Sequence, residues 1–110
     1  MDRIDKILNH DLFLYHLGKN NAAEADRRFC RHSMVHFLDV ARIGTIIALE
    51  EGLELDREWI YAAALLHDCG KHEQYENGTP HEQASARIAP EILKDCGFDD
   101  KETDVIVTAI

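Results

Sequence analysis

The sequence is poor in cysteine and contains no long hydrophobic run. Its three cysteines, Cys30, Cys69 and Cys96, are far apart and form no CxxC pair. An odd number of widely spaced cysteines argues against a disulfide framework and favours a reducing compartment. The first residues, MDRIDKILNHDLFLYH, carry charges at positions 2, 3, 5 and 6. They therefore resemble neither a signal peptide nor a membrane span, and we expect a cytoplasmic protein without membrane contact.

Positive charge is also scarce. Lysine and arginine number 12 against 21 acidic residues, which gives a net charge of −9. Binding to a nucleic-acid backbone requires clustered positive charge, so no nucleic-acid-binding surface is expected. A small phosphorylated ligand stays compatible with this charge, because a bound cation can supply a local positive field.

Strand patterns are nearly absent, whereas helical spacing of apolar residues recurs along all 110 residues. This length suits a single domain. We predict an all-α bundle of about five to six helices. Residues 1–21 would form an N-terminal helix and its connection, and residues 22–110 a helical core. The last helix is still apolar at Ile110, so we expect it to be cut short there.

Apolar spacing and capping residues predict the helix boundaries. The first helix should run from Arg3 to Leu17 and stop at Gly18. A long second helix, 33–51, should end at Gly52. Its stripe His36, Val40, Ile43 and Ile47 should place His36 on the buried face.

The remaining boundaries follow from turn and cap signals. Asp56 should cap a third helix that ends near residue 70, and residues 71–78 should form a loop. Thr79 and Glu82 fit a capping box for a fourth helix, which should reach residues 96–97 with a kink or break at Pro90. A last helix should begin at Asp99 or Asp100.

Metal-capable side chains occur where the third helix ends. The segment AALLHDCGK at 63–71 finishes an apolar helix on His67 and Asp68, and His36 lies on the helix before it. Two imidazole nitrogens and a carboxylate oxygen suit Zn, Fe, Mn, Ni or Co. Adjacent residues of a regular helix point about 100° apart, so they can share a metal most easily at a helix end. A buried His-Asp pair without a partner would also carry a large desolvation cost.

The segments HFLDVA at 36–41 and AALLHDCGK at 63–71 resemble the HD-domain superfamily of metal-dependent phosphohydrolases. The resemblance covers about residues 30–110 and implies an all-α fold with a metal site in the helix core. The superfamily pattern H…HD…D matches His36, His67 and Asp68. Many members bind a second metal through further histidines, and His81 matches one of these. The closing aspartate would come after Ile110, with Asp104 as a weaker candidate.

This resemblance implies a phosphomonoesterase or phosphodiesterase that acts on a nucleotide or another small phosphorylated metabolite. One or two divalent ions (Fe, Mn, Co, Ni or Zn, or else Mg) would be the cofactor. Asp68 could orient or deprotonate the attacking water. Lys71 could offset charge on the phosphoryl group, or it could be a surface lysine favoured by the helix dipole.

Three more residues are candidates for substrate binding: Arg28, Arg31 and His32. Two other functions stay open, a regulatory metal- or nucleotide-binding module without turnover and a di-iron oxygenase. If the closing aspartate follows Ile110, this chain should be a weak catalyst or inactive, and its apolar edge should favour a homo-oligomer.

Overall fold

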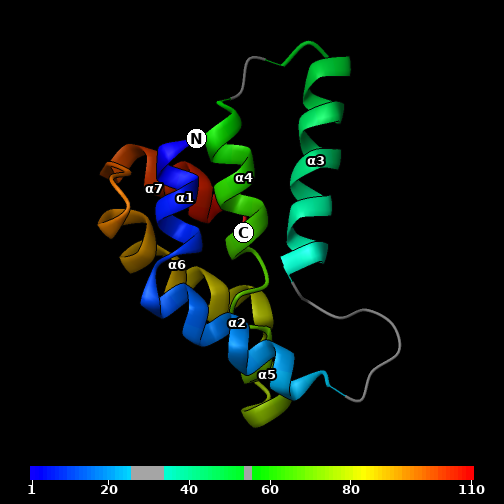
Figure 1. Cartoon of the computed structure of the whole chain (residues 1–110), viewed down its shortest axis with the longest axis vertical. Helices are drawn as coiled ribbons and strands as arrows, with labels where there is room; N and C mark the ends of the chain where they lie inside the picture. The colour runs from blue at the N-terminus through cyan, green and yellow to red at the C-terminus, as the bar shows by residue number, and fades with distance from the viewer. Residues whose placement is uncertain (26–33, 54–55) are drawn as a thin grey trace.

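The regular structure is entirely helical in the residues that the computed structural model describes, which are 1–25, 34–53 and 56–110 (Figure 1). The predicted all-α fold is confirmed, with seven helices in this part of the chain instead of five or six. They are α1 (Asp2–Leu8), α2 (Asp11–Ala23), α3 (Met34–Glu50), α4 (Arg57–Leu66), α5 (Lys71–Asn77), α6 (His81–Asp95) and α7 (Asp100–Thr108). None of these helices is long and apolar enough to cross a membrane.

Helix α4 is central to the core, because α1, α3, α6 and α7 all pack against it (Figure 1). Its Leu65 and Leu66 are fully buried. A charged network holds the N-terminal end of α4. The Arg3 guanidinium of α1 contacts Glu58 of α4 at 3.0 Å and Glu102 of α7 at 2.9 Å. The Trp59 indole N–H donates to Glu102 at 2.7 Å.

The predicted helix from Arg3 to Leu17 is wrong, since two helices occupy this region. Helix α1 ends at Leu8, and the His10 side chain accepts a hydrogen bond from the Leu12 N–H, which caps α2. Gly18 does not end a helix and lies inside α2. The cost of an interior glycine is only about 1 kcal/mol. The tertiary hydrogen bonds of Asn20, beyond Gly18, outweigh that cost and extend α2 to Ala23.

Helix α3 lies along α4 at the edge of the molecule (Figure 1), but its predicted buried stripe is wrong. Ile43 and Ile47 are 57% and 49% exposed. The buried side chains Phe37, Ala41 and Ala48, with Gly44 between them, follow a different helical stripe. A Cβ at Gly44 would lie 3.3 Å from Ile60 Cγ2 of α4. Since α3 is apolar on several faces, periodicity alone could not select the face whose small residues allow this close packing.

Residues 71–78 were predicted to form a loop, and this prediction is wrong. They form α5, which ends at Gly78 in a left-handed conformation with φ of 78°. A helix this short depends on tertiary contacts. It packs on α2 and α6, and Asn20 of α2 accepts a hydrogen bond from the His72 N–H near its start.

Helix α6 begins at His81, with Pro80 in the N-cap position, so the predicted capping box is wrong. The Thr79 hydroxyl instead donates to Asn77 Oδ1. No break occurs at Pro90, because the buried apolar face continues on both sides of it, from Ile88 to Ile92. The other cap predictions are confirmed. Asp56 caps α4, Asp99 caps α7 where the last helix was expected to begin, and Gly52 follows α3 with φ of 69°. Glu102 completes a capping box with Asp99 that was not predicted.

Candidate metal centre

The end of α4 brings His67 and Asp68 together. The helix finishes at Leu66, and His67 is its C-cap residue. The chain then turns toward α5, so Asp68 is not held in helical register with His67. Asp68 is buried, with 8% of its side chain exposed, and its Oδ2 lies 3.0 Å from His67 Nε2.

A second histidine reaches the same carboxylate from α3. His36 Nε2 lies 3.8 Å from Asp68 Oδ2. One ligand atom each from His36, His67 and Asp68 lies within 4.8 Å of the other two, which is close enough to hold one metal ion. The two imidazole side chains are 39% and 28% exposed, so the group faces solvent on one side.

His81, in the first turn of α6, approaches the other oxygen of the carboxylate. Its Nε2 lies 3.6 Å from Asp68 Oδ1. Its Nδ1 lies 2.8 Å from Gln74 Oε1 of α5, an interaction that orients the ring. Three imidazoles from separate parts of the fold therefore surround one carboxylate. His36, His67 and Asp68 would hold one ion, and His81 lies beside the other oxygen of the carboxylate.

The hydrogen bond of His67 Nδ1, the ring nitrogen that does not face Asp68, shows that the site suits a cation. His67 Nδ1 donates to the Ala64 carbonyl at 2.6 Å, so in the neutral ring Nε2 carries a lone pair. That lone pair faces Asp68 Oδ2 at 3.0 Å, and two acceptors this close require a proton or a metal ion between them. Burial opposes charging of the ring, but Asp68 and the Ala64 carbonyl outweigh it and raise the pKa of His67.

Lys71 lies beside these groups as the first residue of α5. Its Nζ is 3.5 Å from His81 Nδ1 and 5.8 Å from the centre of the Tyr75 ring. A helix N-terminus carries positive partial charge, so the dipole does not favour a lysine there. The alternative reading of a surface lysine favoured by the dipole therefore loses its physical basis.

Asp104 and Cys69 do not belong to the grouped ligands. Asp104 is exposed on α7 and does not join the His36, His67 and Asp68 group. Cys69 is buried, and burial raises the pKa of its thiol to about 12, so it stays protonated at neutral pH. The predicted substrate-binding residues Arg28, Arg31 and His32 lie outside the described residues.

Sequence reasoning missed Asn20 and Gln74. Asn20 bonds the Asp68 carbonyl, and Gln74 contacts the His81 ring. Asn20 is fully buried on α2 and bonds to the backbone around Asp68. Its one signal in the sequence is its spacing from Phe13 and His16, which places it on the same buried face of α2. No pattern in the sequence shows which backbone groups it bonds.

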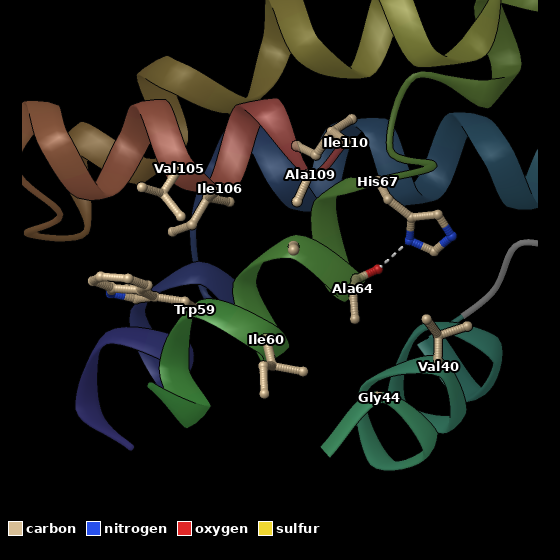
Figure 2. Close-up of a pocket in the computed structure, with 11 residues that line it drawn as sticks. Val40, Gly44, Trp59, Ile60, Ala64, His67, Val105, Ile106, Ala109 and Ile110 are labelled. Atoms are coloured by element: carbon tan, nitrogen blue, oxygen red, sulfur yellow. Dashed lines mark hydrogen bonds between the residues drawn. The ribbon is translucent and has the colours of Figure 1, made fainter. Parts of the chain in front are cut away.

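An apolar cavity of about 450 Å³ between α3, α4 and α7 adjoins His67. Figure 2 shows the His67 ring at one end, with Val40, Ile60 and Ile106 among the side chains around the space. The volume falls in the range of small-molecule pockets. Of the three grouped ligand candidates, His67 is the one that lines this cavity.

Comparison with known proteins gives a family but no characterised relative. The family model described as HD domain matches residues 34–110. A protein of Clostridium beijerinckii, described as uncharacterized, is 49% identical over 110 residues, which is 100% of this chain and 70% of the relative. No solved structure matches the chain.

Proposed function

Because the chain belongs to the HD-domain superfamily of metal-dependent phosphohydrolases, we propose that it hydrolyses a phosphate ester of a nucleotide or another small phosphorylated metabolite. The bond broken would be that of a phosphomonoester or a phosphodiester. The observation that carries this proposal is the group of imidazole nitrogens around the buried Asp68 carboxylate.

The residues present fit a divalent transition metal. His36, His67 and Asp68 would hold the first ion, and His81 with the other oxygen of Asp68 would contribute to a second. When bound, such an ion supplies positive charge that polarises a phosphoryl oxygen and activates water. The neutral form of His67 needed for binding is oriented by its bond to the Ala64 carbonyl.

Three further roles belong to the chain's own side chains. Asp68 would orient the attacking water or accept its proton, since its carboxylate is buried and held among the histidines. Lys71 would place a positive charge near phosphoryl oxygens beside His81. Arg28, Arg31 and His32 are proposed to bind the substrate from the segment that precedes α3.

The apolar cavity supports a substrate with an apolar part. A phosphoryl group at the histidines would leave the rest of the molecule near the cavity that His67 shares. An apolar ring or chain of the substrate could occupy this cavity without a need for hydrogen bonds.

Phosphate release from metal-loaded protein tests the proposal. The chelated chain would be reloaded separately with Mn, Co, Ni, Fe, Zn and Mg and assayed on nucleotides and on a generic phosphodiester. Asp68→Asn should abolish release, because it removes a charged oxygen from the site. Asp104→Asn, a matched change at an exposed aspartate, should leave release unchanged.

The same assay separates the alternatives. Metal binding without phosphate release, both by this chain and by a form extended by a few dozen residues past Ile110, would contradict the phosphohydrolase and support a regulatory module. Oxygen uptake by the iron-loaded form would instead support oxygenase chemistry.

A further inference from the structure

A side chain that lies outside residues 34–110, the part of the chain matched by the HD domain family model, forms hydrogen bonds to the turn that carries His67 and Asp68. That side chain is Asn20 of α2, which is fully buried, whereas the match begins at residue 34. Its Nδ2 donates to the Asp68 carbonyl at 3.0 Å and to the Cys69 carbonyl at 3.3 Å. Its Oδ1 accepts from the His72 N–H at 2.8 Å.

These three bonds give a partner to the His72 N–H and to the Cys69 carbonyl, and they add a second donor to the Asp68 carbonyl, which also accepts from the Lys71 N–H at 3.1 Å. Helix α4 ends before Asp68, and α5 begins with no side-chain cap of its own at Gly70. The first N–H groups of a helix and the last carbonyls have no partner within that helix. The His72 N–H is one of these first N–H groups of α5, and Asn20 accepts from it while its two amide hydrogens go to carbonyls of the turn between α4 and α5.

The opposite side of the turn is fixed by α6. The Gly70 N–H donates to Ser85 Oγ at 3.0 Å. A Cβ on Gly70 would lie 2.7 Å from Ala84 Cβ, so the backbone of the turn touches α6 directly. The turn is therefore held between α2 and α6, and the bonds from Asn20 determine where it sits relative to α2.

We propose that Asn20 is a positioning residue for the metal site. It fixes the Asp68 carbonyl and thereby the direction in which the Asp68 carboxylate leaves the backbone toward His36 and His67. The N-terminal helices then belong to the functional unit, although they lie outside the HD match. This inference rests on the proposed metal site, and it is tested by metal binding instead of hydrolysis.

The test measures Co²⁺ binding by Asn20→Leu and Asn20→Ser in the full chain, at a temperature where circular dichroism shows every variant folded. Leucine has a similar size and forms none of the three bonds, whereas serine is too short to make all of them. Phe13→Leu is the matched control, because Phe13 is fully buried on the same helix. Both the dissociation constant and the visible ligand-field spectrum of Co²⁺ would be recorded.

We expect Asn20→Leu to weaken Co²⁺ binding about 10-fold, the effect usual for residues that orient ligands. Its Co²⁺ spectrum should also change. Asn20→Ser should show a smaller loss, and Phe13→Leu should keep the wild-type constant and spectrum despite lower stability. If Asn20→Leu does not fold, Asn20→Ser is compared with Phe13→Leu alone.

Wild-type affinity and spectrum in a folded Asn20 variant would overturn the inference. An equal loss in Phe13→Leu would also overturn it, because general destabilisation would then explain the effect. Wild-type protein that binds Co²⁺ but releases no phosphate would contradict the proposed activity and leave the role of Asn20 to be decided by these variants.

Discussion

His67 Nε2 and Asp68 Oδ2 lie 3.0 Å apart, although the two residues are neighbours in the chain. Neighbours on a regular helix point about 100° apart. The pair converges because α4 ends at Leu66, which leaves Asp68 outside the regular helix. Asn20 and Ser85 form hydrogen bonds to the turn that follows. The conformation of this turn therefore determines that the two side chains converge.

Substitution of His67 should remove the metal. We expect His67→Ala to lose Co²⁺ or Mn²⁺ from the purified protein, because one of the three grouped ligands is gone and the Asp68 carboxylate loses its nearest imidazole. Elemental analysis after gel filtration gives the stoichiometry. His10→Asn is the control, since His10 caps α2 far from the site and asparagine can replace that cap. Wild-type stoichiometry in His67→Ala would refute the ligand assignment.

Neutralising Lys71 should affect turnover more than metal binding. We expect Lys71→Met to lower kcat by about 10²-fold or more, because removal of a group that stabilises transition-state charge costs roughly 10²–10³. The Co²⁺ dissociation constant should stay unchanged. Lys94→Met, at an exposed position of α6, supplies the control. Equal kcat in both variants would show that Lys71 takes no part in turnover.

The fold class was predicted from helical periodicity, and the grouping of His36, His67 and Asp68 from their match to the HD-domain pattern. Helical periodicity is read within a few turns, and the His-Asp pair terminates one apolar run. The α3 face and the helix at 71–77 could not be predicted, since each depends on a partner distant in the chain. Ile60 of α4 selects the small-residue face of α3, and Asn20 of α2 helps to start α5.

Two glycine substitutions should change stability in opposite directions. Gly70→Ala places a methyl group 2.7–2.8 Å from atoms of Ala84 and Ser85, two of them backbone atoms that cannot rotate away. Overpacking of this kind costs about 1–3 kcal/mol. Gly18→Ala lies inside α2 with nothing within 4 Å of the new methyl group, and it should stabilise the protein by up to about 1 kcal/mol.

Urea unfolding of both variants at neutral pH checks this pair. A Gly70→Ala protein as stable as the wild type would show that the turn can move away from α6. The rigid turn inferred between α2 and α6 would then be wrong.

The last prediction concerns His16, whose Nδ1 lies 2.7 Å from His72 Nε2 between α2 and α5. Burial lowers the pKa of His16, and His72 and Arg87 add to that effect against the opposing charges of Glu73 and Glu76. In the unfolded chain His16 should titrate near its ordinary value of 6.5. Between the two pKa values the unfolded state binds more protons, so the free energy of unfolding should fall as the pH drops through about 6.5.

Measurement requires metal-free protein in chelator, because proton competition at His67 would otherwise contribute. His67 has a raised pKa and acts in the opposite sense, since its contribution is present below 6.5 and is lost as pH rises through the folded pKa. His67 contributes equally to wild type and to His16→Gln, so its contribution cancels when the free energies of unfolding of the two proteins are subtracted. We expect His16→Gln to lose less stability than wild type when urea unfolding is repeated from about pH 8 down to about pH 5.5. Parallel curves would show that His16 binds its proton equally in both states, and that the His16–His72 contact does not hold the ring neutral.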